Sequence, residues 1–393
     1  MTKLVEKVIV GWQRDWGKWP DTENRDYSDV MAMRADRCYA VGSEAVTVRV
    51  RWYPVHRAYV AAGVQALPTP HPYVDNTKPP AKSVLDAMIG DLAAIARECR
   101  ICYWEHAHQC YPAVASSLGR LFRHSILLHG DDCPGSTEIK TMPIACYFDS
   151  VFHGNVIWRS DGDRTRDLYR RFGVRDTHYV SAFTSAGLER GIRDLGWCRP
   201  DGTFDLDRRI DQLRAGGYDC DLAFVGAKMG GQRMLLDGYA DLLRGVGLRV
   251  RFHGVGMRHG PLQPYPPIGI HPLGLAWPLA DLYMRSFSTV NCPFIGLMGT
   301  RPFDAWMSGV LLVSADPVGE MSSLGIQPGI HYAAYDGTLA GLASTVLHYK
   351  GHVDETERIV RAGYEFGRKF FAQHSVDRAM ERVLAANVHK WGW

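Results

Sequence analysis

The residues best suited to chemistry lie between Asn291 and Asp304. Asn291 ends a predicted strand, a glycine-containing loop leads to Thr300, and Arg301 opens a predicted helix. Thr300 is a favourable N-cap residue, and the free N–H groups of a first helical turn attract anions. We therefore expect Thr300 and Arg301 to hold a diphosphate and Asp304 to accept hydrogen bonds from ribose hydroxyls. The plain structural alternative is that Asp304 complements the helix dipole and pairs with Arg301.

Two further glycine-containing turns follow predicted strands in the second half of the chain. Gly226 follows the first strand, with Lys228 and Arg233 close behind, and the second turn leads to Arg258. Glycine lets the backbone approach a ligand, and lysine and arginine offer positive charge to phosphate. The spacing matches neither the Walker A pattern nor the dinucleotide-binding glycine pattern. The turns therefore indicate either phosphate contact or an ordinary strand-to-helix connection.

Titratable side chains follow two predicted strands in the first half. His106 and His108 come after one strand, and Asp131 and Asp132 come after the next. A carboxylate in this position could act as general base on an acceptor hydroxyl or stabilise positive charge at an anomeric carbon. The alternatives are a turn-forming Asp pair and surface or core histidines. A His-x-His metal site is not favoured, because no third ligand is evident.

Tryptophans alternate with basic residues near Trp12, Trp16 and Trp52. Aromatic faces with nearby cations can stack a sugar, a nucleobase or single-stranded nucleic acid. Packing in the core is the other interpretation. We expect these three tryptophans to bind the acceptor, and nucleic acid is kept as a possible partner.

The predicted elements place most of the polar residues at strand ends. Strands are predicted at 5–12, 45–53, 100–104, 125–128, 220–225, 248–253, 289–292 and 310–314, and helices at 83–98, 113–122, 232–246, 301–308 and 353–388. Such alternation predicts right-handed crossovers and parallel sheets. A polar, glycine-rich stretch at 199–218 separates two series of alternating strands and helices. We therefore predict an α/β chain with domains at 1–205 and 206–375, a tail at 376–393, and ligands in the cleft at the carboxyl ends of the strands.

Composition narrows the class of protein. The chain has 393 residues, of which 46% are hydrophobic and 22% charged. This length suits two domains, and the absence of an uncharged apolar run of about 18 residues argues against a membrane span. Nine cysteines are expected to be thiols, and the first residues lack the apolar region of a secretory leader, so we expect the cytoplasm. A net charge of +3 does not by itself indicate a polyanion partner.

From about residue 219 to residue 384 the chain resembles the carboxyl-terminal half of GT-B glycosyltransferases related to the spore-maturation type, in the group 1 glycosyl transferases. The resemblance rests on Leu-Ala-Phe-Val-Gly at 222–226, Leu282-Tyr283 to Asn291, Arg-Pro-Phe-Asp at 301–304 through Gly309, and Gly-Tyr-Glu-Phe-Gly at 363–367 leading to Gln-His-Ser at 373–375 and Arg378. It implies the GT-B fold: two Rossmann-like domains whose parallel sheets face a central cleft, with a last helix that crosses back onto the first domain.

The resemblance also implies an activity, the transfer of a sugar from a nucleotide-diphosphate sugar, with a UDP-sugar as first choice, to an acceptor hydroxyl. The donor would lie on the second domain at Gly226, Lys228, Arg233, Arg258, Tyr283, Asn291, Thr300, Arg301 and Asp304. The acceptor would lie on the first domain, where Asp131, Asp132, His106 or His108 would be catalytic; related enzymes often carry a histidine at such a strand end, facing the donor sugar. No metal and no tightly bound cofactor are expected, since the nucleotide sugar is a co-substrate.

One departure from the related enzymes keeps alternatives open. Retaining relatives commonly place two glutamates eight residues apart, whereas this chain has Gly296 and Asp304 at those positions. The alternatives are a phage-type DNA-modifying glycosyltransferase acting on a hydroxylated base such as a 5-hydroxymethylpyrimidine, a non-catalytic nucleotide-sugar-binding protein, and an epimerase acting on the same donors.

Overall fold

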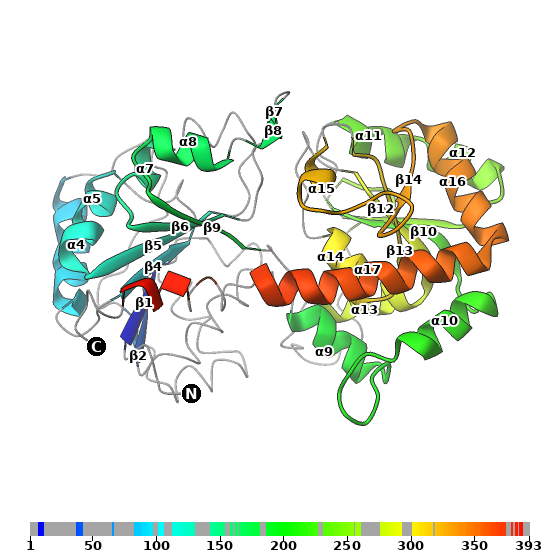
Figure 1. Cartoon of the computed structure of the whole chain (residues 1–393), viewed down its shortest axis with the longest axis horizontal. Coiled ribbons are helices and arrows are strands. Elements are labelled where there is room, and N and C mark those ends of the chain that lie inside the picture. The colour runs from blue at the N-terminus through cyan, green and yellow to red at the C-terminus, as the bar shows by residue number, and fades with distance from the viewer. Residues whose placement is uncertain are drawn as a thin grey trace. The chain divides into compact units, whose positions relative to one another are not determined.

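The chain is shown in Figure 1 as a computed structural model that divides into two units. The structure describes residues 7–11, 37–41, 65–66, 82–96, 101–105, 112–129, 142–153, 158–159, 162–163, 165–180, 186–226, 231–254, 256–260, 276–292, 301–316, 319–374, 379, 382–383 and 385–387. Unit 1 comprises Met1–Ile157, Arg164–Ala182 and His374–Trp393, and unit 2 comprises Trp158–Asp163 and Phe183–Gln373.

Unit 1 is built on a parallel sheet with the strand order β3-β2-β1-β4-β5-β6-β9. The strands are β1 (Lys7–Gly11), β2 (Arg37–Val41), β3 (Gln65–Ala66), β4 (Ile101–Glu105), β5 (His124–His129), β6 (Ser150–His153) and β9 (Asp176–Tyr179), and the helices are α4 (Lys82–Ala96), α5 (Pro112–Leu121), α7 (Met142–Ala145) and α8 (Thr165–Arg171). Val114 and Leu118 of α5, one turn apart, are fully buried against the sheet core that includes Leu127. The predicted strands at 5–12, 100–104 and 125–128 are confirmed, and the one at 45–53 lies outside the described residues.

Unit 2 contains a second parallel sheet, with the order β11-β10-β12-β13-β14. Its strands are β10 (Cys220–Val225), β11 (Val250–His253), β12 (Ser286–Asn291), β13 (Leu311–Ser314) and β14 (Ala333–Ala334). Its helices are α9 (Ala186–Asp194), α10 (Leu206–Arg214), α11 (Gly231–Gly238), α12 (Ala240–Gly245), α13 (Ala276–Met284), α14 (Arg301–Met307), α15 (Glu320–Ser323), α16 (Leu339–Gly351) and α17 (Val353–His374). Two short strands, β7 (Trp158–Arg159) and β8 (Gly162–Asp163), pair antiparallel. Every residue of β12 and β13 is buried, as expected for strands covered on both faces.

Unit 2 begins earlier along the chain than the expected boundary at residue 206. Helix α9 lies before that boundary, yet Leu188 and Ile192 pack with Ala280 and Met284 of α13. This burial of apolar side chains joins residues 186–205 to the second sheet, so the expected first domain of 1–205 is too long at this end.

The long helix α17 packs closely on α14, and Figure 1 shows it crossing in front of α13 and α14. The contact is made by Trp306, whose side chain is buried and donates from Nε1 to the carbonyl oxygen of His331 at 2.7 Å. Gly363 and Gly367, one turn apart on α17, leave room for the indole ring: a Cβ at Gly363 would lie 2.5 Å from Trp306 Cδ1. The two glycines therefore allow α17 to approach α14 closely.

Arg209 of α10 is fully buried in unit 2. Its guanidinium donates to the carbonyl oxygens of Gly309 at 3.2 Å, Met284 at 3.1 Å, Tyr283 at 3.3 Å and Ser286. Burial lowers the pKa of Arg209 to about 9, so the side chain keeps its charge at neutral pH. The carbonyl dipoles compensate the charge and fasten α10 to the amino ends of β12 and β13.

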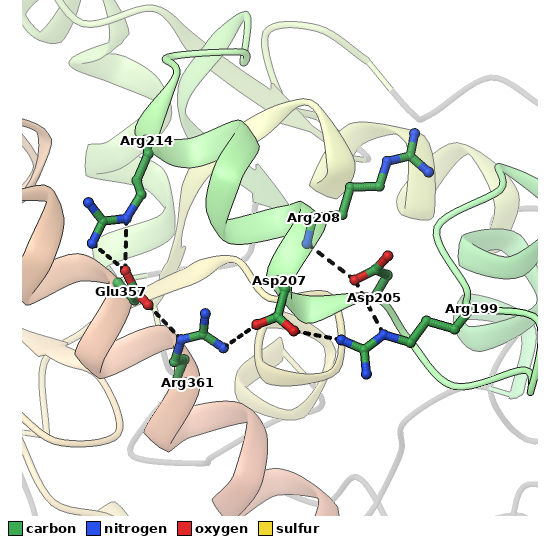
Figure 2. A network of polar contacts seen from close by, with 7 residues as sticks. All are labelled: Arg199, Asp205, Asp207, Arg208, Arg214, Glu357 and Arg361. Atoms are coloured by element: carbon green, nitrogen blue, oxygen red, sulfur yellow. Dashed lines mark hydrogen bonds and ion pairs between the residues drawn. The ribbon is translucent and has the colours of Figure 1, made fainter.

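An ion-pair network joins α10 to α17 at the surface (Figure 2). Asp207 accepts from Arg199 at 2.6 Å and from Arg361 at 2.7 Å, and Glu357 accepts from Arg361 at 2.7 Å and from Arg214 at 2.8 Å. Hydrogen bonds from Arg361 and Arg214 lower the pKa of Glu357. Because several charges share partners, the network holds the two helices in one register.

Candidate functional site

The candidate site lies at the carboxyl edge of the sheet in unit 2. Strand β10 stands between β11 and β12, so the chain leaves it toward β11 on one side and later returns to β12 on the other. Parallel sheets bind ligands at such a point of reversal. Gly226 follows β10, Gly254 follows β11, and Asn291 is the last residue of β12.

Arg301 occupies this point of reversal. Its Nη2 donates to the carbonyl oxygen of Val225 at 2.5 Å, and its Nη1 donates to Asn291 Oδ1 at 3.4 Å. Its Cζ lies 4.3 Å from the centroid of the Phe224 ring, a cation–π geometry. The guanidinium is thereby fixed between the ends of β10 and β12, while part of the side chain remains accessible.

Arg233 of α11 brings a second positive charge to the same edge. Its Nε donates to the carbonyl oxygen of Cys292 at 3.1 Å, and its Cζ lies 6.0 Å from the centroid of the Phe224 ring. Two guanidiniums around one ring concentrate positive charge at the end of β10. Such a pair suits an anion with several oxygen atoms, above all a phosphate or diphosphate.

The backbone at this edge leaves no room for side chains. A Cβ at Gly254, where φ is +145°, would lie 1.9 Å from the carbonyl oxygen of Gly226. A Cβ at Gly226 would lie 2.9 Å from Arg301 Nη2. Glycine at both positions therefore permits the close approach of the two strand ends and of Arg301.

Asn291 and Asp304 lie beside Arg301. Asn291 is buried and donates from Nδ2 to Ser314 Oγ at 3.1 Å, which ties the ends of β12 and β13 together and orients the oxygen that faces Arg301. Asp304 lies one turn after Arg301 on α14 and exposes 5% of its surface. The predicted contact of Asp304 with ribose stays a prediction.

An apolar pocket shares Cys292 with the contact that Arg233 makes. It holds about 460 Å³ of empty space, open solvent included, and is lined by Leu235, Leu236, Tyr239, Cys292, Tyr335, Gly337, Thr338, Leu339 and Leu342. Burial raises the pKa of the Cys292 thiol and of the Tyr335 hydroxyl, so both stay protonated at neutral pH. Cys292 belongs to both places, since its carbonyl oxygen accepts from Arg233. Sequence reasoning missed Tyr335, because no motif accompanies it.

His253, the last residue of β11, is a further titratable group near this edge. Burial and the neighbouring His259 lower the pKa of His253, so its imidazole is neutral at neutral pH. Its Nδ1 is buried and has no hydrogen-bond partner among the residues that the structure describes.

Two further residues expected to bind the donor have partners within unit 2. Arg258 pairs with Asp241 of α12, Nη2 to Oδ2 at 2.7 Å, and the hydrogen bond from Arg258 lowers the pKa of Asp241 to about 2. Tyr283 is 1% exposed in the core formed with α9, just before the amino end of β12. Arg258 therefore neutralises the charge of Asp241, and Tyr283 contributes apolar surface to the core.

The structure brings together Gly226, Arg233, Asn291, Arg301 and Asp304 from the expected set. The other expected residues lie outside the described residues: Lys228, Thr300, His106, His108, Asp131, Asp132, Trp12, Trp16 and Trp52. Their roles, and the nucleic-acid alternative that depends on the tryptophans, stay predictions. Among the described residues no group of three His, Cys, Asp or Glu side chains is placed to hold a metal ion. No helix in the described ranges is both long and apolar enough to cross a membrane.

Comparison with known proteins assigns the fold. No protein-family model matches the sequence, and no curated protein matches it. Solved structures do match. HepE from Anabaena, in complex with UDP and glucose, has 13% identity and a TM-score of 0.56 over 97% of this chain and 99% of that chain. A glycosyltransferase from Rickettsia africae has 10% identity and a TM-score of 0.58 over 97% of each chain.

A UDP-N-acetylglucosamine 2-epimerase also matches, with 10% identity and a TM-score of 0.51 over 93% of this chain and 94% of that chain. Identities of this size establish the fold and not the activity. The chain has the GT-B fold, with two Rossmann-like units that each carry a parallel sheet, and the fold class predicted from the sequence is confirmed.

Proposed function

We propose that the chain is a glycosyltransferase that uses a nucleotide-diphosphate sugar, with UDP as the nucleotide. The observation that carries the proposal is the meeting of Arg301 and Arg233 around Phe224 at the carboxyl edge of the second sheet. The fold is shared with HepE, whose structures hold UDP, glucose and UDP-glucose. In this proposal the diphosphate lies against the two guanidiniums, and the neighbouring apolar pocket receives the flat base.

The reaction breaks the bond between the anomeric carbon and the diphosphate oxygen and forms a bond from that carbon to the acceptor oxygen. Negative charge grows on the departing UDP, and Arg301 and Arg233 stabilise it. Their positions are fixed by carbonyl, amide and ring contacts before the substrate binds, so little reorganisation is needed during the reaction. The acceptor proton passes to a group of unit 1, for which Asp131, Asp132, His106 and His108 remain the candidates. Lys228, Thr300 and Asp304 remain proposed donor contacts.

Isothermal titration calorimetry with UDP and UDP-glucose tests the donor site. Arg301→Gln is expected to weaken UDP binding at least tenfold, because a charge-assisted contact to phosphate contributes about 1.5 kcal/mol or more. Arg358→Gln, an exposed arginine on α17, is the matched control and keeps the wild-type affinity. Absence of binding by UDP, ADP and GDP to the wild type would contradict the proposal.

An epimerase acting on the same donors is the second candidate, favoured by the match to UDP-N-acetylglucosamine 2-epimerase. The two activities differ in their need for an acceptor. Incubation with UDP-N-acetylglucosamine alone, followed by NMR of the sugar, would show conversion by an epimerase, whereas a transferase would leave the sugar intact or release it slowly to water. Donor binding without conversion and without transfer to any acceptor would instead indicate a nucleotide-sugar-binding protein.

A further inference from the structure

A second pocket of unit 2 lies at the far end of α14 from Arg301. It holds about 550 Å³ of empty space, including open solvent at its mouth, and Met307, the last residue of α14, forms part of its wall. At 1.5 Å rise per residue, Met307 is about 9 Å from Arg301 along the helix axis. Because α14 runs back from the carboxyl edge of the sheet, this pocket is at the opposite edge from the donor site.

A tight turn and three helices, α9, α14 and α17, build the pocket. The turn is closed by a hydrogen bond from Arg199 N to the carbonyl oxygen of Thr203 at 2.8 Å and contains Gly202 at φ +84°. It places Thr203 and Phe204 over the end of α14. Arg193 comes from the end of α9, and Tyr364 and Arg368 come from successive turns of α17.

The two arginines of the pocket have no anionic partner in the described part of the chain. Arg193 and Arg368 both line the pocket, and neither forms an ion pair there. The nearby arginines of the network in Figure 2 differ, since Arg199, Arg214 and Arg361 each bind a carboxylate. The carboxylates of that network are thus already paired with arginines other than Arg193 and Arg368. Two like charges that share one pocket favour the binding of an anion between them.

The rest of the lining suits the body of a small molecule. Phe204, Met307 and Tyr364 supply apolar and aromatic surface, and the Cζ of Arg368 lies 5.7 Å from the centroid of the Tyr364 ring. Arginine forks bind phosphate oxygens in pairs, and an aromatic face packs on a sugar-like ring.

We propose that this pocket binds a small phosphorylated molecule, whose phosphate lies between Arg193 and Arg368 and whose body packs on Phe204, Met307 and Tyr364. The site is separate from the donor site and does not depend on the proposed function.

Calorimetric titration of the full chain with glucose 6-phosphate tests the proposal, with glucose and inorganic phosphate titrated alone as the two halves of the probe. Three variants are compared. The double variant combines Arg193→Gln with Arg368→Gln, Arg301→Gln alters the donor site, and Arg358→Gln is a control on the same helix as Arg368. Wild type, Arg301→Gln and Arg358→Gln are expected to bind glucose 6-phosphate alike. The double variant is expected to bind at least tenfold more weakly, with an unchanged melting temperature because both side chains are exposed.

Two results would overturn the proposal. One is absence of binding of both glucose 6-phosphate and inorganic phosphate to the wild type at millimolar concentration. The other is loss of binding in Arg301→Gln with retention in the double variant, which would place the phosphate at the donor edge instead.

Discussion

Gly254 lies so close to Gly226 that a methyl group on it would come within 1.9 Å of the Gly226 carbonyl oxygen. The contact joins the ends of β11 and β10 beside Arg301. The shape of the candidate site thus depends on two glycines from different strands.

We expect Gly254→Ala to weaken UDP binding at least tenfold and to destabilise unit 2 by about 2 kcal/mol or more. The added carbon would force the strand ends apart, and φ at this position is unfavourable for alanine. Urea unfolding and UDP titration measure the two effects. Gly238→Ala, where nothing lies within 4 Å of the added carbon, is the control and should leave binding unchanged. Equal behaviour of the two variants would show that the close approach is unimportant.

Arg233 and Arg258 are expected to differ in their effect on the donor, although both were predicted from the sequence to bind it. Arg233→Gln should weaken UDP binding about tenfold, because its guanidinium lies at the donor edge. Arg258→Gln should change affinity by less than twofold, because its charge is used by Asp241. Titration of both variants with UDP tests this difference. A larger loss of affinity in Arg258→Gln than in Arg233→Gln would show that Arg258, and not Arg233, contacts the donor.

Asp221 gives unit 2 a pH-dependent contribution to stability. Its carboxylate is fully buried and binds Arg249 Nη2 at 2.9 Å and Lys350 Nζ at 2.9 Å. Burial alone would raise the pKa of Asp221, but hydrogen bonds from Arg249 and Lys350 outweigh this and lower it. Since the folded pKa lies below the unfolded value of about 3.9, the contribution is fully present above about pH 4 and is lost as pH falls through the folded pKa.

Asp221→Asn should therefore lower the free energy of unfolding at pH 7 by about 2 to 3 kcal/mol, since it leaves two cations without their buried partner. The difference from the wild type should shrink as pH falls from 4 to 3, as measured by urea unfolding at a series of pH values. Asp354→Asn, at an exposed ion pair, is the control and should show little change. A difference that does not depend on pH would contradict the assigned ion pair.

Gly363→Ala should destabilise unit 2 by about 1 to 3 kcal/mol. The new carbon would lie 2.5 Å from Trp306 Cδ1 and 2.9 Å from the carbonyl oxygen of His331, so α17 must move away from α14. Gly351→Ala, at the end of α16 with open space around the position, is the matched control. Thermal unfolding of both variants measures the effect, and equal melting temperatures would show that the helices adjust freely.

The alternation of apolar strands with amphipathic helices was sufficient to predict the fold class, because burial of β10 and β13 leaves a readable apolar pattern. Helix α10 was missed. The stretch at 199–218 is polar, and the apolar residues of α10, Leu206, Ile210 and Leu213, are few, although they are spaced for one helical face. A single helix was expected at 232–246, but the structure has two short helices, because α11 ends at Gly238 and α12 begins after Tyr239.

The candidate site was only partly predictable. Arg301 and Asn291 were identified because a strand end and a helix start mark their places in the sequence. Tyr283 and Arg258 were assigned from position alone, and their surroundings depend on contacts with α9 and α12, which a local pattern cannot show. The same limit applies to Tyr335, which follows β14 and reaches the pocket from more than 40 residues beyond Cys292 along the chain.

The buried Arg209 has a consequence for synthesis of the chain on the ribosome. Its acceptor carbonyls lie 74 to 100 residues further along the sequence. At about 5 to 20 residues per second, the arginine waits at least several seconds before those acceptors emerge. Until then its charge remains in water, because burial without the carbonyls is too costly. We therefore expect helix α10 to dock only after the last of the carbonyl partners of Arg209 has been made.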